Sequence, residues 1–253
     1  MGSIIEVFPG RRDARRRMQS VQALRSAAGS SDAPIRLRST QLEDFAAIRA
    51  LQRDSHPGFA GWTLKQLESQ RNAFPEGQLV ATSDGEIIGA ASCLVLRWDQ
   101  HALDHTWKSV TGDGFFSTHD TAGRTLYAAE VVVDVSRRGM GAARALYAAQ
   151  RRLCRKLNLR RIIGAARLPG YRAVRGEMSP EHYVQRVIWG DASNAELRFQ
   201  MSQGFQFCGV IEGYLPEDLE SCGHAALVVW LNPLYSPAEP PAKAETQQPR
   251  KCA

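Results

Sequence analysis

The turn from Arg138 to Ala143 has residue types and spacing that could do chemistry. Its sequence, RGMGAA, places two glycines directly before a segment with helical spacing. Backbone N–H groups in such a turn, and at the start of the helix behind it, are free to bind phosphate. Many nucleotides bind at turns of this kind, and other such turns only reverse the chain. The pattern therefore indicates either a phosphate site or a tight turn.

Two better-known glycine motifs are absent from the sequence. No GxxxxGK[ST] occurs, which excludes a P-loop. No GxGxxG occurs either, which argues against a dinucleotide-binding fold. The short turn has to be interpreted through the strand in front of it and the helix behind it.

Glu130 is the candidate for acid–base chemistry. It precedes the run Val131–Val133, whose β-branched residues are typical of a strand buried on both faces. An unpaired charge in such a strand is costly and is rarely kept without a purpose. We expect Glu130 to be a general base that acts through a water, with its pKa raised toward neutrality by burial. A structural ion pair with an arginine is the alternative.

Histidines occur in a long polar segment between Asp99 and Arg124. His119 is followed by Asp120, whose carboxylate could make the imidazole more basic, although adjacent strand residues point in opposite directions. The alternative is that both are simple loop residues. His101 and His105 could share a helix face, but no cysteine or HExxH partner completes a ligand set. We keep His119 as a second catalytic candidate and expect no metal site.

The remaining chain alternates between strand and helix patterns, which predicts an α/β fold. Thr40 is expected to cap a helix with the apolar face Phe45, Ile48 and Leu51, Thr63 to start a second, and Ser179 with Pro180 to start another. A further helix runs from Ala142 to Asn158. Strands are expected at 35–38, 78–82, 86–98, 126–135, 159–166, 205–214 and 224–231, with a last helix at 193–203. Asp84 and Gly85 are expected to form a tight turn between the second and third strands.

Residues 138–143 match R-x-x-G-x-A, which resembles the pyrophosphate-binding motif of the GNAT superfamily of N-acyltransferases. The resemblance implies a mixed, mostly antiparallel sheet of seven or so strands, flanked by helices and with splayed central strands. It implies acetyl-CoA as the acyl donor and the preceding strand as the binding edge for its pantetheine arm. The cofactor-binding residues would be Val131, Val132, Val133, Arg138, Gly139, Met140, Gly141, Ala142, Ala143 and Arg144.

Several longer segments narrow the resemblance to one kind of GNAT domain. HTWKSVTGDGFFSTHD, LNLRRIIGAARLPGY, MSPEHYVQRVI and GYLPEDLES look like the GNAT part of bacterial proteins that also carry a carbon–nitrogen hydrolase (nitrilase-like) domain. Only 18 residues follow Tyr235, too few for that second domain. We therefore expect no hydrolase activity from this chain.

One position departs from the family pattern. Many GNAT enzymes have a tyrosine four residues before the glycine that ends the last helix, where it acts as general acid, and this sequence has Gln200. An amide cannot supply that proton. Tyr171, Tyr183 and Tyr214 are the substitutes considered, and Tyr171 leads because its loop follows a strand end. Arg167, in the same loop, is expected to bind the acceptor.

Composition limits the other functions. The 253 residues carry a net charge of +6 and are 43% hydrophobic, which suits one domain at 34–235, a basic flexible leader at 1–33 and a disordered tail at 236–253. No apolar run reaches the roughly 20 residues of a membrane helix. With no signal sequence either, a cytoplasmic protein with reduced cysteines is expected. The arginines are spread out, so nucleic-acid binding is disfavoured.

The combined expectation is an N-acetyltransferase that transfers an acetyl group from acetyl-CoA to a primary amine by direct attack in a ternary complex. The alternative is a catalytically weak acyl-CoA-binding sensor, or a partner of a separate amidohydrolase. The acceptor, a small molecule or a peptide, cannot be identified from the sequence. A homodimer stays open.

Overall fold

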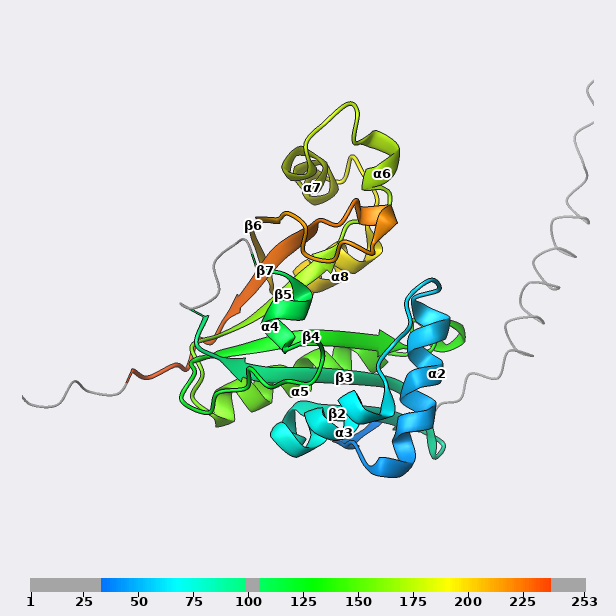
Figure 1. Cartoon of the computed structure of the whole chain (residues 1–253), viewed down its shortest axis with the longest axis vertical. Helices are drawn as coiled ribbons and strands as arrows, with labels where there is room; N and C mark the ends of the chain where they lie inside the picture. Colours follow the sequence, from blue (N-terminus) through cyan, green and yellow to red (C-terminus); the bar gives the residue numbers. More distant parts are fainter. Residues whose placement is uncertain (1–32, 99–104, 238–253) are drawn as a thin grey trace, which may run out of the picture.

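The computed structural model describes residues 33–98 and 105–237. The expected leader, His101 and the tail beyond residue 237 lie outside the described residues. The described chain forms one seven-stranded sheet with the strand order β1-β2-β3-β4-β5-β7-β6, flanked by helices (Figure 1). The strands are β1 (Arg36–Ser39), β2 (Gln78–Ser83), β3 (Glu86–Leu96), β4 (Thr125–Val133), β5 (Arg161–Arg167), β6 (Gln206–Ile211) and β7 (Ala225–Leu231). The expected mixed, mostly antiparallel sheet is confirmed.

Helices cover both faces of the sheet. They are α2 (Phe45–Ser55), α3 (Leu64–Ala73), α4 (Trp107–Thr111), α5 (Ala142–Lys156), α6 (Tyr171–Val174), α7 (Pro180–Trp189) and α8 (Ala195–Ser202). Short 3₁₀ turns lie at η1 (Leu42–Asp44), η2 (Pro75–Gly77), η4 (Val135–Arg137) and η5 (Leu219–Ser221). No helix among the described residues is long and apolar enough to cross a membrane.

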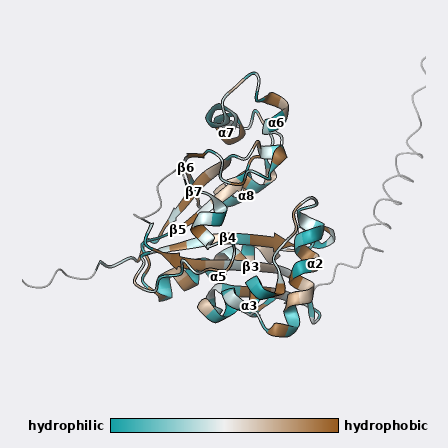
Figure 2. Cartoon of the chain, viewed as in Figure 1, coloured by the Kyte–Doolittle hydropathy of each residue, from teal (hydrophilic) through white to brown (hydrophobic). Residues whose placement is uncertain are grey.

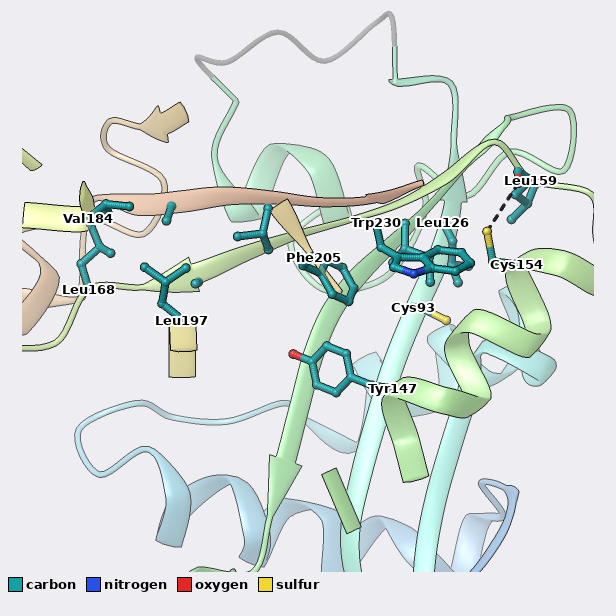
Figure 3. Packing of buried hydrophobic residues seen from close by; sticks show 14 of the residues in the cluster. Cys93, Leu126, Tyr147, Cys154, Leu159, Leu168, Val184, Leu197, Phe205 and Trp230 are labelled. Atoms are coloured by element: carbon teal, nitrogen blue, oxygen red, sulfur yellow. Dashed lines mark hydrogen bonds between the residues drawn. The ribbon is translucent and has the colours of Figure 1, made fainter. Parts of the chain in front are cut away.

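Successive residues of β4 point to opposite sides, apart from one extra residue at Ala129, and this assigns the helices to faces. Tyr127 and Val132 pack with residues of α2, α3 and α4 in one buried cluster. Leu126 packs with α5 and α8 in another, part of which Figure 3 shows. Figure 2 shows hydrophobic residues concentrated along the central strands, between these helix layers. We call the two sides the α2 face and the α5 face.

The central strands β4 and β5 are the one parallel pair in the described sheet, and they pair over a short length. Thr125–Ala128 of β4 match Arg161–Gly164 of β5, and no pairing follows. Beyond this point the residues 129–133 and 165–167 belong to strands that are no longer bonded to each other. We call this opening the gap. The splayed strands implied by the family resemblance are therefore present.

An irregularity in β4 lies beside the gap. Ser92 of β3 pairs with Glu130, whereas Cys93 pairs with Ala128, so Ala129 is an extra residue in β4. Such a bulge bends the strand and changes the direction of the side chains around it. It directs Glu130 to the α2 face, where its carboxylate meets Gln52 of α2.

Several expected boundaries agree with the structure. Asp84 and Gly85, with φ of 52° and 80°, form the tight turn between β2 and β3. The side chains of Thr63 and Ser179 cap α3 and α7 as expected.

The helix start expected at Thr40 and the strand end expected at Val135 were wrong, and the strand expected at 205–214 ends at Ile211. Thr40 is buried and caps no helix, because a 3₁₀ turn capped by Gln41 precedes α2. Val135 lies outside β4, because the Asp134 side chain accepts a hydrogen bond from the Ser136 N–H and starts η4.

Candidate functional site

The glycine turn presents an open surface at the start of α5. Gly139 and Gly141 have φ of 89° and 100°, which favours glycine at both positions. A Cβ at Gly139 would meet no atom within 4 Å, and one at Gly141 would meet only Ile35 Cδ1 at 3.7 Å. No side chain caps α5, so the N–H groups of its first turn remain available to an anion. The turn fits a pyrophosphate, and the exposed Arg138 and Arg144 lie beside it.

The edge of β4 that faces the gap offers backbone groups. The Asp134 N–H donates to Ile88 O at 2.9 Å, and the Val132 carbonyl lies 3.1 Å from where a Cβ of Gly89 would be. The backbone N–H and C=O groups of residues 132 and 134 therefore point toward β3. Because these directions alternate, Val131 and Val133 direct theirs toward the gap. Of the three valines expected to bind the pantetheine arm, Val132 is engaged by β3, whereas Val131 and the Val133 N–H face the gap. The Val133 carbonyl accepts a hydrogen bond from Ser55 Oγ at 3.0 Å.

Glu130 is half-buried at the start of this edge. The Gln52 Nε2 donates to its Oε2 at 2.5 Å. Among the described residues no arginine or lysine forms an ion pair with Glu130. Burial raises the pKa of Glu130 to about 7, against the hydrogen bond from Gln52, which lowers it. The structural ion pair considered as the alternative is thus not found in this part of the chain.

His119 lies at the other end of the β3–β4 ladder. The Val95 N–H donates to its Nδ1 at 3.1 Å, and its ring stacks on Phe74. Val95 pairs with Leu126, four residues before Glu130 in β4. Burial lowers the pKa of His119 and outweighs the opposing charge of Asp120, which itself pairs with Arg97. The structure does not bring His119 and Glu130 together.

The three tyrosines considered as general acids use their hydroxyls elsewhere. Tyr171 donates to Met178 O at 3.2 Å, and Tyr183 donates to Pro169 O at 2.9 Å. Tyr214 shares a hydrogen bond of 2.6 Å with the buried Tyr127. Tyr171 opens α6, which lies with α7 away from the gap in Figure 1. No observed contact links any of the three to Glu130.

Arg167 ends β5 and connects the two sides of the gap. Its guanidinium binds both carboxylate oxygens of Asp218 at 2.6 Å. It also lies over the ring of Phe59, 4.9 Å from the centroid, with Nη1 at 3.4 Å from the His56 Nδ1. His56 and Phe59 follow α2, which packs on the other half of the sheet. Burial lowers the pKa of His56, and the charges of Arg167 and Arg138 lower it further, which favours the neutral imidazole.

A second half-buried carboxylate, Glu196, lies beside Arg167. The Arg167 N–H points to its Oε1 at 3.4 Å, and burial raises its pKa to about 7. Sequence reasoning missed Glu196, Gln52, His56 and Phe59, because tertiary contacts bring them to the gap from separate elements. No group of three or more metal-ligating side chains occurs among the described residues.

Comparison with known proteins agrees with this geometry. The model of the acetyltransferase (GNAT) family matches residues 45–175. The uncharacterized N-acetyltransferase YkwB of Bacillus subtilis is 33% identical over 177 residues, which cover 70% of this chain and 78% of YkwB. This chain belongs to the GNAT family of acetyltransferases.

Two further similarities concern domain organisation and fold. The probable hydrolase YhcX of Bacillus subtilis is 36% identical over 203 residues, which cover 80% of this chain but 40% of YhcX. The chain therefore spans about two fifths of that relative. The GphF GNAT-like decarboxylase, solved in complex with isobutyryl-CoA, has a TM-score of 0.66 and 23% identity, over 78% of this chain and 99% of that one. This last likeness shows the fold alone.

Proposed function

We propose that the protein is an N-acetyltransferase that transfers an acetyl group from acetyl-CoA to a primary amine by direct attack in a ternary complex. One observation carries the proposal. Glu130 is a half-buried carboxylate with a pKa near 7, without an ion-pair partner in the described chain, at the point where β4 leaves β5. A carboxylate with this pKa can accept a proton near neutral pH, which an amine nucleophile requires.

The two faces of the sheet would have different roles, one in binding the acyl donor and the other in accepting the proton. On the α5 face, the turn 138–143 and the first N–H groups of α5 would hold the pyrophosphate of acetyl-CoA. The backbone of Val131 and the Val133 N–H would align the pantetheine arm, and the Val131 N–H would stabilise the oxyanion. On the α2 face, Glu130 would take the proton of the attacking amine through a water. The gap joins the two faces, so donor and acceptor would meet there.

The acceptor end of the site is proposed to include Arg167. Its guanidinium lies at the C-terminal end of β5, between Phe59 and Asp218, where the loop after α2 reaches the gap. Small-molecule and peptide amines both remain candidates for the acceptor. A panel of both kinds, assayed with acetyl-CoA by release of free thiol, tests the proposal, and turnover of none would contradict it.

A second candidate function rests on a different observation. Gln200 stands where the family has its general-acid tyrosine, and YhcX, of which this chain spans 40%, is named a probable hydrolase. The chain would then be a catalytically weak acyl-CoA-binding sensor or the partner of a separate amidohydrolase. Calorimetry with acetyl-CoA, combined with the turnover assay, distinguishes the two functions. Tight binding without turnover of any amine favours the second.

A further inference from the structure

A hydrogen bond between α5 and α8 involves the position where the family tyrosine is missing. Gln200 of α8 donates from Nε2 to the hydroxyl oxygen of Tyr147, 3.1 Å away. Both side chains are buried, at 6% exposure each. In Figure 3 the ring of Tyr147 leaves α5 with its hydroxyl pointing away from that helix. Phe199 and Phe205 contact this ring edge-on, both with centroids at 5.6 Å, and fix its direction.

The hydroxyl lies on the face of the sheet that carries the pyrophosphate turn. Tyr147 is about 1.7 turns along α5 from Gly141, and α5 packs against β4. Gln200 lies on α8, which packs against β5. A bond between these two helices therefore bridges the two strands that separate at the gap. Glu196, one turn before Gln200, is close enough to Tyr147 for its charge to act on the hydroxyl.

Three buried amide atoms on α5 and α8 lack hydrogen-bond partners in the described part of the chain. Among the described residues, none forms a hydrogen bond with Gln200 Oε1 or with either amide atom of Gln150. Gln150 is fully buried and follows Tyr147 by three residues, on the same side of α5. Buried amide groups rarely stay unsatisfied without a reason. A ligand with its own amide groups, such as the pantetheine arm, would supply the missing partners.

We propose that Tyr147 donates the proton to the sulfur of the departing CoA and that Gln200 positions its hydroxyl. This inference rests on the proposed function. Because Gln200 donates to the hydroxyl oxygen, the hydroxyl hydrogen is left free for another acceptor. Burial raises the pKa of Tyr147, and the Glu196 charge adds to this, so the phenol stays protonated at neutral pH.

The amine nitrogen bonds to the carbonyl carbon, the C–S bond breaks, and its electron pair goes to sulfur. Tyr147 gives its proton to that sulfur and takes one back from solvent, to which Glu130 releases the proton it has accepted. Glu130 takes the proton released by the amine. The products are an amide and a free thiol.

Tyr147→Phe tests the inference, because it removes only the hydroxyl. With the best amine of the panel, kcat should fall about 10²-fold. A second readout needs no turnover: the ultraviolet absorbance of the thiolate reports the pKa of the CoA thiol bound to the enzyme. Loss of a hydrogen-bond donor should raise that pKa by about one unit. Affinity for CoA, measured by calorimetry, should change by no more than about twofold, or about 0.4 kcal/mol.

Tyr127→Phe is the matched control. It also removes a buried, hydrogen-bonded hydroxyl, but on the α2 face, and should change neither readout. Unchanged kcat and thiol pKa in Tyr147→Phe would overturn the inference. If the wild type acetylates no amine but the thiol pKa still shifts in Tyr147→Phe, the proposed function fails, and only the position of the Tyr147 hydroxyl beside the CoA sulfur is supported. If Tyr147→Phe does not fold, Gln200→Leu decides in its place: a raised thiol pKa supports the inference, and an unchanged one overturns it.

Discussion

The side-chain amide of Gln52 binds the Glu130 carboxylate in one orientation, which a second hydrogen bond determines. The Gln52 Oε1 accepts a hydrogen bond from the Trp62 N–H at 3.0 Å, which leaves Nε2 to donate to Glu130 Oε2. Gln52 is 1% exposed, and a Cβ at Gly61 would lie 3.0 Å from its Oε1, so the amide has little room to move. The position of Glu130 is therefore determined by α2 and the loop that follows it.

Replacing Gln52 should shift the pH dependence of the reaction. In Gln52→Leu, the hydrogen bond that lowers the pKa of Glu130 is lost, so that pKa should rise above about 7. The inflection in kcat/KM against pH should move upward with it. Gln206→Leu, an exposed substitution on β6, serves as the control. If the inflection does not move in Gln52→Leu, the group that titrates in the pH profile is not Glu130.

Glu130→Gln preserves the shape of the side chain and removes its basicity. Folding and CoA affinity should be intact, and kcat/KM should fall by roughly 10² or more at neutral pH. Activity should return in part at alkaline pH, where the amine deprotonates unaided. Full turnover with an unchanged pH profile would move the search for the base to His119 or to a chain of waters.

The same substitution should change stability with a defined sign. The folded state raises the pKa of Glu130 from 4.5 to about 7, so it binds more protons than the unfolded state between these values. Glu130 therefore contributes stability at low pH that is lost as pH rises through about 7. Glu130→Gln should gain free energy of unfolding relative to wild type from about pH 5 to about pH 8. Urea unfolding of both proteins at about pH 5 and at about pH 8 measures this gain. A difference in free energy of unfolding that is the same at both pH values would contradict a raised pKa of Glu130.

Gly141→Asp should weaken the binding of CoA. The φ of 100° disfavours any side chain, and the new carboxylate would stand next to the bound pyrophosphate. Affinity should fall at least tenfold, roughly 1.4 kcal/mol, in calorimetry. Gly176→Asp controls for the added charge, because Gly176 is exposed and its Cβ would meet nothing within 4 Å. If folded Gly141→Asp binds CoA like the wild type, the pyrophosphate binds elsewhere.

Arg167 is predicted to act on the acceptor. Arg167→Ala would leave the buried Asp218 without its partner and risk unfolding. Arg167→Lys and Phe59→Leu are safer, since the first keeps the charge and the second leaves the ion pair. Both should raise the acceptor KM and leave the acetyl-CoA KM unchanged. The exposed Arg172→Ala is the control, and equal effects on both KM values would indicate a structural role for Arg167.

Local features of this chain could be predicted from sequence, because their causes are local. The turn at Asp84–Gly85, the cap at Ser179 and the helix from Ala142 each depend on residues a few positions apart. Helices α4 and α6 were missed, since five and four residues carry no periodicity. Gln52 and Tyr147 could not be assigned, because their partners Glu130 and Gln200 are 78 and 53 residues away in sequence.

The short pairing of β4 with β5 should also govern amide hydrogen exchange. In the free protein, the Val131 N–H points into the gap and has no strand beside it, whereas the Leu126 N–H lies within the paired segment. Val131 should therefore exchange its amide hydrogen with solvent much faster than Leu126, although the two share one strand. Saturation with CoA should slow the exchange at Val131 and leave that at Leu126 unchanged. Exchange along β4 would thus locate the bound arm of the cofactor residue by residue.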